Sequence, residues 1–454
     1  MKKGRINCII IRMVVSTVSA FLLLLTFAEQ TVEANEKCPD AIINNVLSNN
    51  NEIHENALGS INRNQPEGCI KKLVEVVVSG KQNEAKIRAI QGLRQYNNNR
   101  MIKIWMSLLD KTDSFIIKKQ IIQSLANMKN RSVVPELIPL LRSPFFTVRE
   151  SAASALSKYG DDRVFPFIIS MSKDDNPVYR MYAIEAMMHI YDSRLYYMLM
   201  SLLNDQNKSI RYAVLECIQE NSIDKGLPHV RKAAMNDDNH EVRVRAMNLL
   251  SDFNDSRSYS IFVRNLSDEH EQVRDAAVMA LNRLGYRKSA WPLSRQLVKE
   301  TEQHVKLHII QTLAAIRETG DVRGLGSIIE DDPGVVLRIE AACALGIIGE
   351  NKGIPFLLKA LDDDEYRVRA EAACALGVFQ GSEVVTSLLR ELEKDNNRYV
   401  RSAVLYSLQK IGDTGALLGL YRIYCVEKDP VMKALLDTVI KEFIRKTTRE
   451  YGIR

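Results

Sequence analysis

Apolar residues recur along most of the chain at helical spacing, and the whole pattern repeats every 31 or 32 residues. The clearest example is "RIEAACALG" at 338–346, which is repeated as "RAEAACALG" at 369–377. Steps of the same length in both directions reach a basic residue each time, which we call the anchor of its repeat. The anchors are His54, Lys86, Lys118, Arg149, Arg180, Arg211, Arg243, Arg274, Lys306, Arg338, Arg369, Arg401 and Lys433.

The residues around each anchor predict a helix with one buried stripe. Positions one before and three, six and seven after the anchor are mostly small or apolar, and these offsets share one face of an α-helix. A second apolar-periodic segment precedes each anchor, as in "VVPELIPLL" at 133–141 and "GIPFLLKAL" at 353–361. Each repeat therefore predicts two helices. The residues seven after the anchors are Ile61, Leu93, Leu125, Leu156, Met187, Ile218, Leu250, Leu281, Leu313, Leu345, Leu376, Leu408 and Ile440.

Two further columns define the ends of the second helix. An acidic residue lies six positions before the anchor in nine consecutive repeats, where it can accept backbone amides at the start of the helix. Glycine lies eleven positions after four anchors, where a helix end uses the left-handed conformation. The acids are Asp174, Asp205, Asp237, Asp268, Glu300, Asp332, Asp363, Asp395 and Glu427, and the glycines are Gly160, Gly285, Gly349 and Gly412.

The chain at this point resembles the HEAT repeat family, specifically its short, bilin-lyase-like form. The resemblance rests on the acidic column, the Val-Arg pair, the Ala-Ala-Leu stripe and Pro135, Pro166, Pro292 and Pro355, over about 38–440. It implies an all-α fold, an α-solenoid of about 13 helix pairs in a right-handed superhelix, with the second helices on the concave face. We expect residues 35–454 to form one such solenoid.

In that family the acidic and basic columns form a ladder between successive repeats, so the resemblance implies a structural role for them here. Thr112 replaces the acid near the N-terminus, and Lys or His replaces Arg in the first three repeats, so we expect no ladder there. The expected ladder residues are Asp174, Arg180, Asp205, Arg211, Asp237, Arg243, Asp268, Arg274, Asp332, Arg338, Asp363, Arg369, Asp395 and Arg401.

The N-terminus has the form of an export signal. Four basic residues, from Lys2 to Arg12, precede the apolar run at 13–28, and Val32 and Ala34 offer a small-residue cleavage site. The run is shorter than the ~20 residues of a membrane-spanning helix. We expect residues 1–34 to be a cleaved signal peptide and the chain to be periplasmic, secreted or on the cell surface. An uncleaved anchor is the alternative.

The charge balance argues against a nucleic-acid-binding protein. The chain has 62 Lys and Arg and 56 Asp and Glu. The expected signal segment carries four of these bases and two acids, which leaves a nearly neutral mature chain. Nucleic-acid binding calls for bases concentrated on one face.

Three His-Glu pairs, at His54, His240 and His270, raise the question of a metal site. Deoxyhypusine hydroxylase, an iron enzyme built of similar repeats, carries such pairs directly after the anchor. Here the three pairs fall in three different registers. His304 and His308 are four residues apart, but no third ligand is evident. We expect no metal, no cofactor and no catalytic residues.

The cysteines divide into three groups. Cys38 and Cys69 begin the first helices of neighbouring repeats, so they are candidates for a disulfide in an oxidising compartment; two free thiols are the alternative. Cys217 and Cys425 are expected in the core. Cys343 and Cys374 are both five positions after an anchor, off the buried stripe. They mark either a partner surface, a redox or metal-touching patch, or simply small residues on an inner face.

A segment rich in Met and Tyr, residues 178–203, contains a candidate partner surface. Met181, Tyr182 and Met188 fall off the buried stripe, and Met and Tyr form adaptable contact surfaces. Core packing is the alternative for these side chains.

The sequence therefore predicts an exported, non-catalytic scaffold that binds another protein on its concave face. An enzyme or a lyase-like accessory factor on the same scaffold is the alternative, and a nucleic-acid-binding HEAT protein is a lesser one. No phosphate-binding loop, nucleophile elbow or paired-cysteine metal motif occurs in the sequence. The identity of the partner is left open.

Overall fold

The computed structural model describes residues 38–96, 98–317 and 322–450, and these residues form 26 α-helices, eight short 3-10 helices and no strand. The helices fall into two units, which divide between Asn221 and Ser222. The expected signal segment, residues 1–34, lies outside the described residues. The expectation of a single uninterrupted array stays a prediction.

The first unit contains six helix pairs. Its first helices are α2 (Asp40–Val46), α4 (Glu67–Ser79), α6 (Arg100–Lys111), α8 (Val134–Leu137), α10 (Val164–Ser172) and α12 (Tyr196–Leu202). Its second helices are α3 (Asn51–Asn64), α5 (Asn83–Leu93), α7 (Phe115–Asn127), α9 (Phe146–Tyr159), α11 (Pro177–His189) and α13 (Lys208–Glu220).

The second unit contains seven pairs. Its first helices are α14 (Leu227–Asn236), α16 (Tyr259–Asn265), α18 (Ala290–Lys299), α20 (Arg323–Asp331), α22 (Ile354–Ala360), α24 (Ser382–Lys394) and α26 (Leu417–Val426). Its second helices are α15 (His240–Asp252), α17 (Glu271–Leu284), α19 (Gln303–Ile316), α21 (Val335–Ile348), α23 (Tyr366–Leu376), α25 (Arg398–Ile411) and α27 (Pro430–Glu450).

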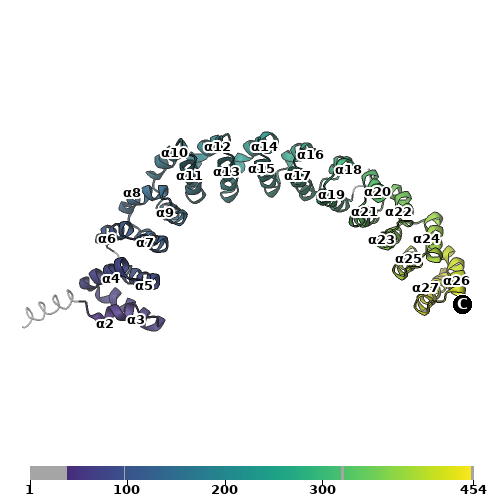
Figure 1. Cartoon of the computed structure of the whole chain (residues 1–454), viewed down its shortest axis with the longest axis horizontal. Coiled ribbons are helices and arrows are strands. Elements are labelled where there is room, and N and C mark those ends of the chain that lie inside the picture. The colour runs from purple at the N-terminus through teal and green to yellow at the C-terminus, as the bar shows by residue number, and fades with distance from the viewer. Residues whose placement is uncertain (1–37, 97, 318–321, 451–454) are drawn as a thin grey trace, which may run out of the picture. The chain divides into compact units, whose positions relative to one another are not determined.

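Every anchor is the fourth residue of its second helix, from His54 in α3 to Lys433 in α27. The apolar residue seven positions later is buried in all thirteen second helices. Within each unit the first helices form one layer and the second helices another (Figure 1). Each side chain of the stripe lies between these layers, where full burial contributes about 1.5–3 kcal/mol. The repeat of the sequence is therefore a repeat of one packing environment.

Successive second helices pack more closely than successive first helices within each unit. Glycines allow the closest approaches in the second unit. A Cβ atom on Gly346 of α21 would lie 2.9 Å from the Cα atom of Ala375 in α23, and one on Gly377 would lie 2.9 Å from the Ser407 hydroxyl of α25. The surface of the second-helix layer is consequently made of small side chains and backbone at these points.

The left-handed helix end recurs even where glycine is absent. Gly160, Gly285, Gly349 and Gly412 have positive φ, as the sequence predicts. The same position, eleven residues after the anchor, also has positive φ in five repeats without glycine: Gln65, Lys129, Ser222, Asn254 and Arg317. The packing of the next helix therefore imposes this conformation on residues that adopt it at a cost.

One first helix differs from the predicted pattern. Residues 133–141 were expected to form a single helix, but the segment contains 3-10 turns at Arg131–Val133 and Ile138–Arg142 with only four α-helical residues between them. Pro139 has no amide hydrogen to donate, so the α-helix cannot continue through it. The remaining 3-10 turns, at the starts of later first helices, are Ser193–Leu195, Asp224–Gly226, Ser256–Ser258, Arg287–Ser289, Asn351–Gly353 and Thr414–Ala416.

Candidate binding surfaces and their supports

The N-terminal repeat is tied to its neighbour by a covalent bond. Cys38, next to α2, and Cys69, in the first turn of α4, form a disulfide with their Cα atoms 4.7 Å apart. Both are buried. The Lys72 ammonium group donates to the Cys38 carbonyl at 2.9 Å and pairs with Asp40 at 2.6 Å. The first two repeats are thus joined by both a disulfide and a polar contact.

The anchor of this first repeat, His54, serves the fold. Its ring is buried, and Nδ1 lies 2.5 Å from the carbonyl oxygen of Val46, the last residue of α2. His54 therefore links α3 to the end of α2.

The anchors of later repeats link neighbouring repeats through their charged groups. Arg338 donates to the Asp332 carbonyl of its own repeat at 2.9 Å and pairs with both carboxylate oxygens of Asp363 in the next repeat, at 2.8 and 3.0 Å. The closest contacts of the same kind are Arg180–Asp205 (2.7 Å), Arg243–Asp268 (2.8 Å), Arg274–Glu300 (2.7 Å), Lys306–Asp332 (2.5 Å), Arg369–Asp395 (2.6 Å) and Arg401–Glu427.

Each acid of this column also supports the start of the second helix. Asp363 accepts the backbone amide of Glu365, the residue before α23, at 2.9 Å, and Asp237 accepts that of Asn239 at 3.0 Å. The accepted amide belongs to the residue that precedes the helix, two positions after the acid. Arg211 makes the contact within its own repeat, donating to the Asp205 carbonyl at 2.8 Å.

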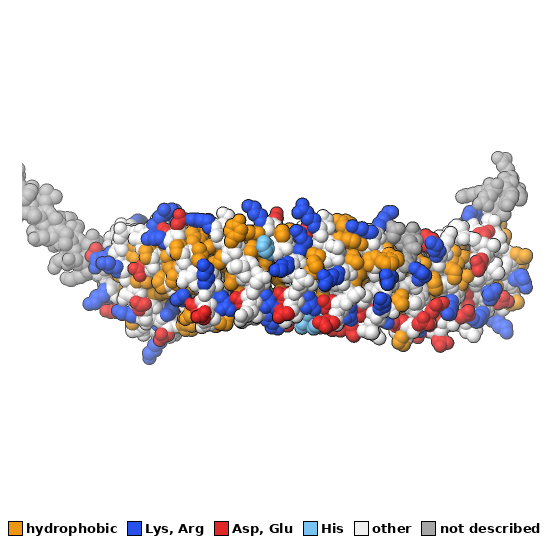
Figure 2. All heavy atoms as spheres, turned by 90° about the horizontal axis from the view of Figure 1, so that it is seen from above, with side chains coloured by type: hydrophobic (Ala, Val, Ile, Leu, Met, Phe, Trp, Pro, Cys, Tyr) orange, Lys and Arg blue, Asp and Glu red, His pale blue; other side chains and the backbone are white. Residues whose placement is uncertain are grey.

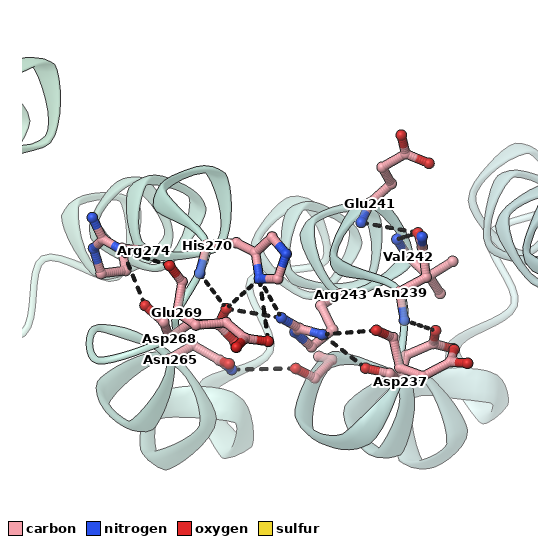
Figure 3. A network of polar contacts seen from close by, with 12 residues as sticks. Asp237, Asn239, Glu241, Val242, Arg243, Asn265, Asp268, Glu269, His270 and Arg274 are labelled. Carbon is pink, nitrogen blue, oxygen red and sulfur yellow. Dashed lines mark hydrogen bonds and ion pairs between the residues drawn. The ribbon is translucent and has the colours of Figure 1, made fainter. Parts of the chain in front are cut away.

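Figure 3 shows this arrangement around Arg243 of α15. Its guanidinium group lies between the Asp237 carbonyl, at 2.9 Å, and the Asp268 carboxylate, at 2.8 Å. The ring of His270 is next to it, with Nδ1 3.4 Å from Arg243, and stacks on His240. The His residues of two of the expected His-Glu pairs are therefore close together, but as part of the contact between α15 and α17.

The electrostatics of the ion pairs follow from these contacts. The Arg401 guanidinium group holds the pKa of Glu427 below its usual range. Burial alone would raise the pKa of Asp205, but hydrogen bonds from Arg180 and from the Asn207 amide outweigh it, and the pKa is lowered. These carboxylates therefore stay ionised, and removing a basic partner would leave a charge in a desolvated site.

The ladder is interrupted in the first unit. Thr112 replaces the acid before α7; it is buried, and its hydroxyl has no hydrogen-bond partner among the described residues. Ser143 replaces the acid before α9, so Lys118 of α7 has no carboxylate at the ladder position of the next repeat. Arg149 instead pairs with Glu185 of α11 at 2.7 Å, and Asp174 lies 3.4 Å from Arg142.

The Met and Tyr residues singled out in α11 are only partly accessible. Met181, Tyr182 and Met188 are half-buried. The Arg149 guanidinium group lies over the Tyr182 ring, 3.6 Å from its centre. Tyr182 therefore makes a cation–π contact with the neighbouring repeat.

Cys343 and Cys374 are half-buried in the second-helix layer of the second unit. Burial, with the nearby Glu371 and Glu340 carboxylates, raises the pKa of Cys343 to about 11, so this thiol is protonated at neutral pH. Cys217 is buried. The expectation of a buried Cys425 is wrong: this thiol is exposed, because the apolar first helix α26 turns it away from the core.

A groove of about 430 Å³ lies beside Cys343, between α19 and α21. Its apolar lining includes Ile310, Ala315 and Ile347. Exposed apolar side chains continue along the same layer at Val378, in the turn that follows α23, and at Tyr406 of α25. We call this surface, Cys343, Ile347, Cys374, Val378 and Tyr406, the inner strip.

A second exposed apolar surface was not predicted from the sequence. It lies at the starts of α7, α9 and α11, where Phe146 is 56% exposed and Phe115 49%. A signal for it exists: the residue before the second helix is polar or glycine in every repeat from α3 to α25 except α9, where it is Phe145. We call this surface the aromatic ridge; it comprises Phe115, Ile116, Phe145, Phe146 and Val178.

Charged side chains are distributed differently in the second unit. Glu269, Asp331 and Asp364, close to the ladder acids in the turns before the second helices, are exposed. Figure 2 shows acidic side chains gathered along one edge on the C-terminal side of the molecule.

Within residues 38–96, 98–317 and 322–450, no three His, Cys, Asp or Glu side chains are grouped so that they could hold a metal ion. Among the helices of the described chain, none combines the length and apolar character needed to cross a bilayer.

Comparison with known proteins gives a family match and a fold match. The profile of HEAT repeats matches residues 102–188, 196–282, 227–314, 262–346, 292–377, 322–409 and 354–436. No curated protein matches the sequence.

Among solved structures, Kap121p is similar with a TM-score of 0.54 and 16% identity, over 91% of this chain and 54% of that one. The karyopherin Kap121p bound to the SUMO protease Ulp1p gives a TM-score of 0.54 and 16% identity, over 91% and 55%. This chain thus spans about half the length of those proteins. Such low identity shows the fold alone. The HEAT profile, in contrast, covers more than half of the sequence, and the chain therefore belongs to the HEAT repeat family.

Proposed function

We propose that this chain is an exported HEAT-repeat scaffold that binds another protein on its second-helix face and carries out no catalysis of its own. The observation that carries the proposal is the inner strip. Ile347 and Val378 are 43% and 41% exposed at equivalent positions of neighbouring repeats, and Tyr406 is 60% exposed. Aligned apolar side chains on an accessible surface are typical of a protein interface.

Two further observations support parts of the proposal. The Cys38–Cys69 bond favours an oxidising compartment, since disulfides are rare in reducing ones. The basic and apolar pattern of residues 1–34 is that of an export signal. The fold is shared with Kap121p, for which structures bound to Ulp1p and Pho4p exist. Repeat arrays of this kind offer extended surfaces for macromolecular partners.

The experiment places a photoreactive amino acid at Ile347 of the full chain and crosslinks in intact cells. The matched control carries it at Gln123, on the second-helix layer of the first unit. We expect a protein to be attached through position 347 and identified by mass spectrometry. Binding of that purified protein should weaken about tenfold in an Ile347→Ser/Val378→Ser variant, a loss of about 1.4 kcal/mol.

Two results would contradict the proposal. Attachment of the same proteins from both positions would mean that the inner strip selects no partner. Recovery of the chain only in the cytosolic fraction, with an intact N-terminus, would contradict export. The binding and export parts can therefore fail separately.

A further inference from the structure

The aromatic ridge lies where the ladder of ion pairs is interrupted. Ser143 stands where later repeats carry an acid, and its hydroxyl accepts the Phe145 amide at 3.3 Å, as Asp174 accepts that of Asn176. The serine keeps the backbone contact of the acid but carries no charge. The anchor of the preceding repeat, Lys118, is consequently without a carboxylate partner in the described part of the chain.

A lysine anchor can complete the ladder when an acid is present. In the second unit Lys306 pairs with Asp332 of the next repeat at 2.5 Å. Lys118 instead lies over the Phe145 ring, 5.9 Å from its centre. The missing ion pair therefore follows from Ser143 and not from the shorter reach of lysine compared with arginine.

The helix α9, which begins at the ridge, has no side-chain cap at its start. Asn176 and Asn207 accept backbone amides at the starts of α11 and α13, whereas Phe145 before α9 makes no such bond. A side-chain cap typically stabilises a helix, so Phe145 costs the fold stability. It also leaves an aromatic ring 44% exposed next to Phe146. A local loss of stability together with exposed aromatic residues is characteristic of interaction surfaces.

Cations lie against the aromatic rings of the ridge. Lys118 of α7 lies over Phe145 of the next repeat, and the Arg149 guanidinium group lies 5.7 Å from the centre of the Phe146 ring. Exposed aromatic rings and cations are thus adjacent on this surface. A partner on this surface would contact both kinds of group.

We infer that the aromatic ridge binds a protein segment in which carboxylates alternate with apolar side chains. A carboxylate of the segment pairs with Lys118 and so supplies the ladder acid that Ser143 replaces. Its apolar side chains pack on Phe115, Phe145 and Phe146. This surface is separate from the inner strip, so the inference does not require the proposed function to be correct.

The probe is a fluorescein-labelled peptide that alternates Asp and Leu, titrated with the full chain and followed by fluorescence anisotropy. The same peptide with Lys in place of Asp tests the charge. We expect the acidic peptide to bind and the basic peptide to bind at least about tenfold more weakly, with the acidic complex weakened by salt.

Four variants test the residues. Phe146→Ser and Lys118→Gln should each weaken binding about tenfold. Ser143→Asp should weaken binding similarly, because the introduced carboxylate can pair with Lys118 as Asp332 pairs with Lys306. Phe145→Asn should weaken binding while raising the melting temperature, since asparagine restores the helix cap. A variant that merely unfolds the chain cannot give this combination.

Tyr399→Ser is the matched control: Tyr399 is a highly exposed aromatic residue near the start of α25 in the second unit. It should leave the affinity of the acidic peptide unchanged. Equal binding of the two peptides, or unchanged affinity in Ser143→Asp and Phe146→Ser, would overturn the inference.

Two other occupants give distinct results, and either would overturn the inference. If the ridge binds membranes, the chain sediments with vesicles of phosphatidylcholine and phosphatidylglycerol, and Phe146→Ser abolishes this without the acidic peptide binding. If it binds a second copy of the chain, Phe146→Ser changes the mass in analytical ultracentrifugation, again without the acidic peptide binding.

Discussion

The first two repeats and the repeats of the second unit are joined to their neighbours by different kinds of bond. The first two repeats, residues 40–93, are joined by the Cys38–Cys69 disulfide and have no ladder pair. From α15 to α25 an anchor of each repeat pairs with an acid of the next. In the described chain, a covalent bond thus joins the repeat of α2 and α3 to its neighbour, where the later repeats use an ion pair.

The largest effect is expected from breaking the covalent bond. The disulfide spans 31 residues. Cys69→Ser should therefore destabilise the first two repeats by about 3–4 kcal/mol, mainly by freeing the unfolded chain. Hydrogen exchange of α2 to α5, read by mass spectrometry, should quicken while that of α15 to α25 stays the same, because stability in repeat arrays is local.

The exposed thiol gives the control for this prediction. Cys425→Ser should leave exchange unchanged in every helix, since Cys425 is unpaired and exposed. Equal protection of α2 to α5 in wild type and Cys69→Ser would mean that packing alone holds the terminal repeat.

A smaller effect is expected from removing one rung of the ladder. Arg338→Ala leaves the largely buried Asp363 carboxylate without its partner and should cost about 2–3 kcal/mol. The loss should appear as faster exchange in α21 and α23. Lys118→Ala removes an anchor that has no carboxylate partner in the described chain and should cost less than about 1 kcal/mol.

Equal losses in these two variants would contradict the distinction between the repeats. In that case the aliphatic part of the anchor side chain, and not its charge, would be what stabilises each repeat.

The smallest effect concerns pH. Burial raises the pKa of Glu391 to about 7, and the neighbouring Asp395 adds to the shift. A carboxyl with a raised folded pKa contributes stability at low pH and loses it as pH rises through the folded value. Glu391→Gln should therefore stabilise the second unit by about 1 kcal/mol above pH 8 and have no effect near pH 4.

For the ladder acids, the contribution to stability changes with pH in the opposite direction. The pKa values of Glu427, Asp205 and Glu300 are lowered, so their stabilisation is present at neutral pH and is lost as pH falls through the folded values. The disulfide-linked repeats lack these pairs. Acid should release α15 to α25 before α2 to α5, and simultaneous loss in both regions would contradict this order.

The sequence predicts the fold well because one column of residues reports one packing environment. The anchors mark the fourth residue of every second helix, and the apolar residue seven later is buried throughout. Pro139 and Cys425 show what hydrophobic periodicity does not predict. Periodicity gives the spacing of buried residues, but it reports neither the missing amide hydrogen of Pro139 nor the rotation of the short first helix that exposes Cys425. Hydrophobic periodicity does not predict the aromatic ridge either, because its signal is a single replacement, Phe145, in a column of otherwise polar residues or glycine just before the second helices.

The bond between Cys38 and Cys69 also determines what happens to the first repeat when a protease cleaves the chain. The turn between α2 and α3 is exposed at Asn49 and Asn50, which makes it an accessible site for cleavage. A cut there would normally shed the leading helix. Because Cys38 lies before the cut and Cys69 after it, the severed piece stays attached, and the nicked molecule keeps its first repeat in place.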